Sequence, residues 1–108
     1  MSCDLKGKWA YISGPVGGGF AEFARAERDC IDAGAATVIN PTSLIAKVES
    51  GKLTREEATR MNLRGLTQCD VIVMLDGWGI SDAAALEYQI AKDIGIDVMT
   101  EWAVRLGR

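Results

Sequence analysis

DVIVML, Asp70 to Leu75, is an almost unbroken run of apolar residues in the 108-residue chain. Such a run is typical of a central strand in a parallel sheet, because helices cover both faces of that strand. On either side of it, short strand-like runs alternate with segments of helical periodicity. The segment therefore predicts the middle of an open parallel sheet.

Two more strand-like segments precede it, WAYIS at 9–13 and ATVIN at 36–40. The segment between them is amphipathic and ends at Gly34, a residue that favours the position just after a helix. Its expected inner face consists of Phe20, Phe23, Ala24, Cys30 and Ile31. A short helix is expected over 42–50, where Gly51 ends it.

A further helix begins near Thr54, because Thr54 and Glu57 have the spacing of a capping box. Its expected inner face consists of Ala58, Met61, Leu63 and Leu66. A helix over about 83–95 and a last strand over 96–100 follow the central strand, before a C-terminal tail. This order predicts an α/β fold: a three-layer open parallel sheet of Rossmann or flavodoxin-like type, with four to five strands and helices on both faces. Residues 1–108 then form a single domain.

Composition limits the function. The chain is 48% apolar and 25% charged, with a net charge of −3 and no basic stripe, which argues against duplex nucleic acid as a partner. No apolar run approaches the length of a membrane span, and the first residues show no secretory signal, so we expect a cytoplasmic protein. The three cysteines have no paired spacing, so neither a disulfide framework nor a metal site is expected, and no cofactor is indicated.

A glycine-rich loop, SGPVGGG at 13–19, follows the first predicted strand. In an open parallel sheet such a loop lies at the carboxyl edge, where ligands bind. Its backbone N–H groups suit anionic or strongly polar ligand atoms, and the missing Cβ atoms allow close approach. The candidate binding residues in it are Ser13, Gly14, Pro15, Gly17, Gly18 and Gly19. Alternatively the glycines only form a tight turn, since their spacing is neither G-x-G-x-x-G nor that of a Walker A loop.

A second loop, DGWGISD at 76–82, follows the central strand and belongs at the same edge. Its candidate site residues are Asp76, Trp78, Ser81 and Asp82, and Glu87 lies just inside the helix that follows. Asp76 and Asp82 have ordinary alternative roles, as a turn former and as a helix N-cap respectively. Trp78 is either a stacking platform for a base or a cover on the core. Glu87 either faces solvent or points into the cleft.

Four segments of the chain together resemble the nucleoside 2-deoxyribosyltransferase-like superfamily, and within it a phage and bacterial branch. They are YISGP at 11–15, INP at 39–41, CDVIVMLDGW at 69–78 and ALEYQIAKDIGIDV at 85–98. The individual motifs are loose, but their order and spacing are specific and span nearly the whole chain. The resemblance implies the same open α/β fold.

The resemblance also implies roles for individual residues. Glu87, with Ala91 after it, matches the E-x-x-x-A glutamate that attacks the sugar C1′ in active relatives. Tyr11 matches a tyrosine near that nucleophile, and the glycine loop matches the lining of the sugar or phosphate pocket. A carboxylate in this position captures an oxocarbenium-like C1′ and passes it to water or to another base.

Two departures from the family pattern bear on the chemistry. Active relatives carry an aspartate where this chain has Asn62, and an amide hydrogen-bonds a base but delivers no proton to it. With no histidine in the chain, a general acid must be Asp76, Asp82 or a substrate-bound water. Relatives that hydrolyse monophosphates have arginines where this chain has Gly17 and Phe20, so a free nucleoside fits better than a nucleotide.

Three functions remain open at this point. The first is an enzyme that cleaves an N-glycosidic bond or transfers 2-deoxyribose, the second a nucleotide-like ligand-binding module without efficient turnover, and the third an interaction protein. The expected partner is a small nucleoside or nucleotide, with no membrane involved. The resemblance further implies a homo-oligomer, in which Glu101 and Trp102 of the tail help complete a neighbouring site.

Overall fold

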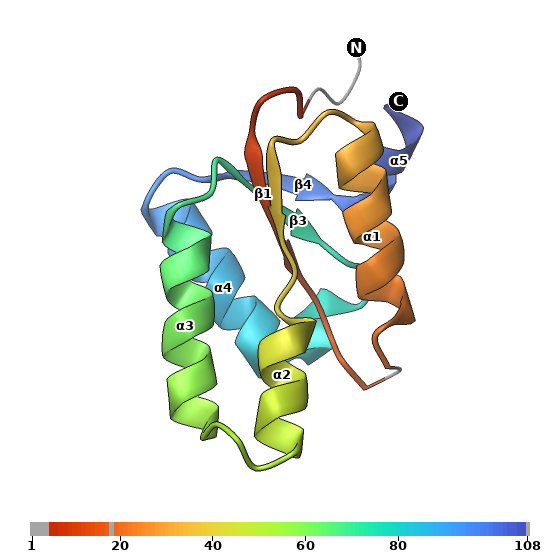
Figure 1. The fold of residues 1–108 in the computed structure, drawn as a ribbon. Helices are drawn as coiled ribbons and strands as arrows, with labels where there is room; N and C mark the ends of the chain where they lie inside the picture. Colours follow the sequence, from red (N-terminus) through yellow and green to blue (C-terminus); the bar gives the residue numbers. More distant parts are fainter. Residues whose placement is uncertain (1–4, 18, 108) are drawn as a thin grey trace.

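Four parallel strands form one sheet in the part of the chain that the computed structural model describes, residues 5–17 and 19–107. Their order across the sheet is β2-β1-β3-β4 (Figure 1). The strands are β1 (Trp9–Ser13), β2 (Thr37–Ile39), β3 (Val71–Met74) and β4 (Asp97–Thr100). The predicted parallel sheet of an α/β fold is confirmed. The described residues form four strands, the lower end of the expected range of four to five.

Strand β3 lies inside the sheet, as its apolar sequence predicts. It pairs with β1 on one side and with β4 on the other, and all four of its residues are buried. Alternate residues supply the two faces: Ile72 and Met74 pack into one core, and Val71 and Val73 pack into another. A strand with no solvated face has no position for a polar side chain, which explains its unbroken apolar run.

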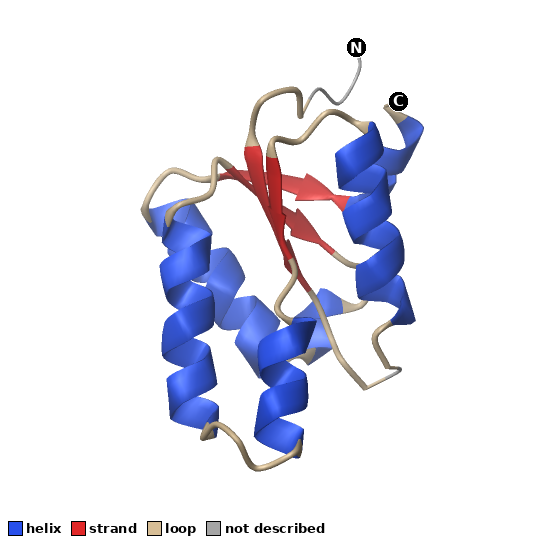
Figure 2. Ribbon diagram, in the orientation of Figure 1, coloured by secondary structure: helices blue, strands red, loops and turns tan. Residues whose placement is uncertain are grey.

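Helices cover both faces of the sheet, so the fold has three layers (Figure 2). Helices α1 (Ala21–Asp32) and α5 (Glu101–Leu106) pack on one face, and α3 (Arg55–Thr67) and α4 (Asp82–Asp93) on the other. The shorter α2 (Thr42–Glu49) lies beside α3 and has no fully buried residue. No helix within the described residues is both long enough and apolar enough to cross a membrane.

Several local predictions can be checked against the helix ends. The Thr54–Glu57 capping box is confirmed, since each residue's side chain accepts a hydrogen bond from the other's backbone N–H. The N-cap of α4 is Ser81 rather than Asp82, because the Ser81 hydroxyl accepts the Ala84 N–H at 3.2 Å. The segment after 100 was expected as a tail but forms α5, which is capped by the Thr100 side chain.

The inner face of α3 differs in part from the expected one. Ala58 and Leu66 are buried, but Met61 is 42% exposed. Gly65 also belongs to the inner face, where α3 passes very close to β2. A Cβ added at Gly65 would lie 3.2 and 3.3 Å from two side-chain carbons of Ile39. The absence of a side chain at position 65 therefore sets how closely α3 approaches the sheet.

We predict that Gly65→Leu lowers the free energy of unfolding by about 1–3 kcal/mol, the usual cost of inserting bulk into a packed interior. Leucine is a better helix former than glycine, so helix propensity cannot explain a loss. Urea denaturation measures the effect, with Arg64→Leu as the control, because it places the same side chain on the exposed face of α3. Equal midpoints for the two variants would contradict the close approach.

Candidate functional site

The candidate site is built around Glu87, which α4 places against the end of β1. The Tyr11 hydroxyl donates a hydrogen bond to Oε2 of Glu87 at 2.6 Å, and the Ser13 hydroxyl donates to Oε1 at 2.6 Å. Tyr11 and Ser13 are fully buried, and Glu87 is only 9% exposed. The carboxyl group is therefore held from the sheet side by one hydroxyl on each oxygen.

The local sequence explains why these three side chains meet. Tyr11 and Ser13 are two residues apart on a strand, so they face the same side of the sheet. On α4, Ala84 and Ala91 are buried three residues before and four residues after Glu87, which puts all three on the inner face. The small alanine side chains let α4 approach the sheet closely. The interpretation of Glu87 as a solvated helix residue is therefore wrong.

Burial and hydrogen bonding act in opposite directions on this acid. Burial raises the pKa of Glu87 above its ordinary value of 4.5, and the bonds from Ser13 and Tyr11 partly offset that rise. Burial, followed by the nearby Glu87 carboxylate, raises the pKa of Tyr11 well above the ordinary tyrosine value. The phenol consequently keeps its proton and remains a donor to the carboxylate.

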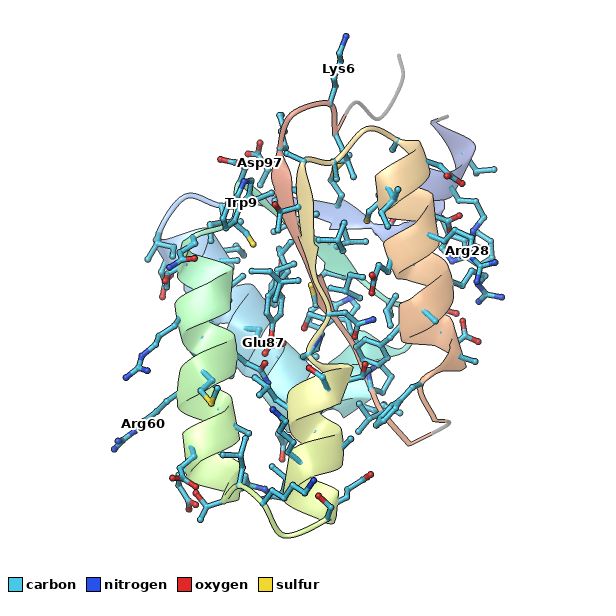
Figure 3. The ribbon with its side chains drawn as sticks, in the orientation of Figure 1. Lys6, Trp9, Arg28, Arg60, Glu87 and Asp97 are labelled. Atoms are coloured by element: carbon cyan, nitrogen blue, oxygen red, sulfur yellow. The ribbon has the colours of Figure 1, made fainter. Side chains whose placement is uncertain are left out.

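A hollow of about 320 Å³ opens beside the Glu87 carboxyl group. It lies at the carboxyl edge of the sheet, between the glycine loop and helices α2, α3 and α4. Figure 3 shows Glu87 inside the fold, whereas Lys6 and Arg60 extend away from it. The lining includes Gly14, Val16, Pro41, Ile45, Val48, Ala58, Asn62 and Ser81. Gly14 and Glu87 therefore line a common cavity.

A second hollow, of about 490 Å³, adjoins the first between α3 and α4. The two hollows share Arg55, Thr59, Asn62, Ser81, Ala83 and Glu87. Asp82 and Leu86 line only the second one. Glu87 thus faces a continuous space that reaches toward both α2 and α4, and we refer to the two hollows together as the Glu87 cavity.

Asn62 brings an unused hydrogen-bond acceptor to this cavity. Its Oδ1 atom is buried, and no described residue donates a hydrogen bond to it. Buried polar atoms in native proteins nearly always have a partner, so an exception on the wall of a cavity points to a ligand donor or an ordered water. Oδ1 of Asn62 is therefore available to accept a hydrogen bond from a ligand, as the predicted binding role of Asn62 requires.

Charge in the cavity is mostly negative. Arg55 is the cation among its lining residues, while Glu49, Asp82 and Glu87 contribute carboxyl groups. Among the described residues, no group of three or more histidine, cysteine or acidic side chains is placed to hold a metal ion. The site offers carboxyl, amide and hydroxyl groups on a largely apolar wall.

Other predicted residues lie on the opposite side of the glycine loop. Pro15, Gly19 and Asp76 line a separate hollow of about 350 Å³ together with Glu101 and Trp102. The Asp76 backbone N–H donates to Oε2 of Glu101 at 2.7 Å, which ties this loop to α5. The structure therefore brings Asp82, but not Asp76, to the cavity that contains Glu87.

Two further predicted loop residues, Trp78 and Gly17, line neither part of the Glu87 cavity. Trp78 packs against the Tyr88 ring, with 4.5 Å between ring centroids, and covers the core beside α4. An added Cβ at Gly17 would meet no atom within 4 Å, so this part of the loop is open. Gly18 lies outside the described residues.

Among the comparisons with known proteins, the model for the Domain of unknown function (DUF4406) matches residues 8–100. The chain belongs to the DUF4406 family. The matched region contains Tyr11, Ser13, Asn62 and Glu87, and it ends one residue before Glu101. Neither the curated proteins nor the solved structures contain a match to the chain.

Sequence reasoning missed the walls that α2 and α3 contribute to the cavity of this DUF4406 domain. Ile45 and Val48 come from α2, and Arg55 and Thr59 precede Asn62 on α3. A signal was present in the spacing: residues 55, 59 and 62 are four and three residues apart, so they form one polar stripe along a helix.

Exposed apolar surface also remains on α5, where Trp102 is 50% exposed, and the expected homo-oligomer stays a prediction.

We predict that Glu87→Gln changes how the stability of the domain depends on pH. Because the native pKa of Glu87 is raised, the folded state binds this proton more tightly than the unfolded state does. The stability that Glu87 contributes is therefore complete below pH 4.5, its ordinary pKa, and is lost as pH rises through the native pKa. The amide introduced by the substitution has no such titration.

Thermal or urea unfolding between about pH 4 and pH 8 measures the effect. Wild type should lose stability relative to Glu87→Gln as pH rises, while the exposed control Glu56→Gln should run parallel to wild type. A difference between wild type and Glu87→Gln that stays constant or changes in the opposite direction would show that Glu87 is not buried as described.

Proposed function

We propose that this DUF4406 domain cleaves N-glycosidic bonds, or transfers 2-deoxyribose, on nucleoside-type substrates with Glu87 as the nucleophile. The observation that carries the proposal is a buried carboxyl group with a hydroxyl donor on each oxygen, facing a cavity. Acidic side chains are rarely buried unless they are paired, and a buried acid with a raised pKa beside a cavity is a candidate for catalysis. The resemblance of the YISGP and ALEYQIA segments to deoxyribosyltransferases supports the same assignment.

The proposed reaction has two steps with Glu87 between them. In the first, the bond from C1′ to the base nitrogen breaks and its electron pair leaves with the base, while a Glu87 oxygen bonds to C1′. In the second, water or another base attacks C1′, and the ester bond to Glu87 breaks to restore the carboxylate. A 2-deoxy sugar favours both steps, since it lacks the electron-withdrawing 2-hydroxyl group.

The departing base needs a proton, and two carboxyl groups besides Glu87 line the cavity: Asp82 on α4, one of the predicted acids, and Glu49 on α2. Asp82 lines the same space as Glu87, whereas Asp76 lies in the hollow beside α5. We therefore assign the general-acid role to Asp82 or to a water held by the substrate. The amide of Asn62 hydrogen-bonds the base, but it is not an acid and does not protonate the base.

The charge of the cavity favours an uncharged substrate. Three carboxyl groups and one guanidinium line it, so a phosphate monoester would meet net repulsion. Free deoxynucleosides avoid this cost. The lining therefore supports deoxynucleosides over deoxynucleoside monophosphates as substrates.

We predict that the domain releases free base from deoxynucleosides, and that Glu87→Gln lowers the rate by at least about a thousandfold, as removal of a nucleophile does. Chromatography of the released base measures both. The exposed Glu56→Gln should retain the wild-type rate, and monophosphates should react more slowly than the free nucleosides. Base release that survives in Glu87→Gln would exclude the proposed nucleophile.

A second candidate function is ligand binding without efficient turnover, and Asn62 is the observation that favours it. The cavity and its orphan acceptor would still select a ligand, while the missing acid would leave the glycosidic bond intact. Thermal stabilisation by deoxynucleosides without released base would identify this function, because a ligand that binds only the native state raises its melting temperature.

We predict that Asn62→Asp increases base release, by about 10²-fold or more if proton delivery limits the wild-type rate. The new carboxyl group would lie close to Glu87, and two neighbouring carboxyl groups share a proton readily because they resist double ionisation. The same chromatographic assay measures the gain, with Asn62→Ala as the control for loss of the amide. An Asn62→Asp rate no higher than that of Asn62→Ala would show that this position does not supply the missing proton.

A further inference from the structure

Ser13 was expected to bind the ligand, but its contacts indicate a different role. Its hydroxyl points at Oε1 of Glu87, and among the described residues Glu87 is its only hydrogen-bond partner. Ser13 is fully buried at the last position of β1. It is not among the residues that line the Glu87 cavity, whereas its neighbour Gly14 is.

The position of the Ser13 hydroxyl is fixed by the sheet. The Ser13 backbone oxygen accepts the Leu75 N–H at 2.8 Å, which joins the end of β1 to the end of β3. A serine side chain has one carbon–carbon torsion, so a fixed backbone leaves few positions for its oxygen. Gly14 follows directly, and a Cβ there would lie 2.6 Å from the Leu75 Cβ, so the packing at this point is tight.

Two bonds to different oxygens restrain the carboxyl group more than one bond does. With Tyr11 alone, only Oε2 of Glu87 would have a donor, and Oε1 would have none among the described residues. The additional bond to Ser13 fixes the plane of the group, since both donors belong to the same strand. Each oxygen of a carboxylate has about two acceptor positions, so one on each remains for a ligand.

We propose that Ser13 is a positioning residue that orients the Glu87 carboxyl group toward the cavity, an inference that rests on the proposed role of Glu87 as nucleophile. A hydroxyl bonded to a carboxylate stabilises the charged form more than the neutral form. The bond from Ser13 is the larger of the two hydrogen-bond contributions that lower the pKa of Glu87 against the effect of burial.

Other charged and titratable groups face the same carboxyl group and act alongside Ser13. They are Tyr11 on β1, Arg55 on α3, Asp82 on α4 and Glu49 on α2. Of these, only Tyr11 is hydrogen-bonded to Glu87 within the described part of the chain. Replacing Ser13 therefore removes one of two direct contacts and leaves the longer-range charges unchanged.

The experiment follows the ionisation of Glu87 directly, by carbon-13 NMR of the protein labelled at glutamate side-chain carboxyl carbons. The Glu87 signal is identified by its absence in Glu87→Gln. In Ser13→Ala, the titration midpoint of this signal should rise by on the order of one pH unit relative to wild type, the scale of a lost charge-assisted hydrogen bond. Ser13→Cys keeps a side chain of similar size with a weak donor, so its midpoint should also rise. The exposed control Ser43→Ala should leave the midpoint unchanged.

A midpoint that stays at the wild-type value in both Ser13→Ala and Ser13→Cys overturns the proposal. This readout needs no turnover, so it separates the role of Ser13 from the proposed function. Where base release is observed, the acid side of the pH–rate profile should move to higher pH in Ser13→Ala, with kcat lowered more than KM is changed. A change confined to KM would instead make Ser13 a ligand contact.

Discussion

A carboxyl group that is almost fully buried needs hydrogen-bond donors, and here strand β1 provides two. Tyr11 and Ser13 present hydroxyls on the same side of the sheet, and α4 must lie close enough for Glu87 to reach both. This requirement fixes the rotation of α4 about its axis and its height above β1. Ala84 and Ala91 permit the approach because their side chains are small.

The topology turns this contact into an accessible site. Strands β1 and β3 are neighbours, but the chain leaves β1 toward α1 on one face and leaves β3 toward α4 on the other. Loops that diverge in this way leave a crevice at the carboxyl edge of the sheet. Helices α2 and α3 wall the part of the crevice beside Glu87, while α5 borders a separate hollow on the other side. The glycine loop separates the two spaces.

The sequence predicted the sheet well because its buried strands leave little ambiguity. The apolar run at 71–74 has no polar position, as is typical of a strand covered on both faces. Amphipathic helices were less certain at their inner faces: Met61 and Leu66 both fit a helical stripe, but only Leu66 is buried. Helix α5 was missed because six residues give little periodicity, although Thr100 is a suitable cap.

The candidate site could be predicted only in outline. Resemblance and spacing singled out Tyr11 and Glu87. The direction of the Glu87 side chain stayed open, because the apolar neighbours Leu86 and Ile90 did not show which face of the helix is buried. Leu86 is in fact 48% exposed, so the alanines mark the buried face rather than the larger side chains. The partner of Ser13 and the walls from α2 depend on how helices pack across the sheet, and one sequence does not specify that geometry.

The ion pairs of Arg105 give the last helix a role beyond packing. Arg105 contacts Glu101 at 2.9 Å and Asp29 of α1 at 3.0 Å, and Glu101 in turn holds the backbone of Asp76. The matched family region ends at Thr100, so Glu101 and Arg105 of this clamp lie outside it, whereas Asp29 and Asp76 lie within it. A shortened protein cut at the family boundary would lose the brace while keeping every residue of the Glu87 cavity.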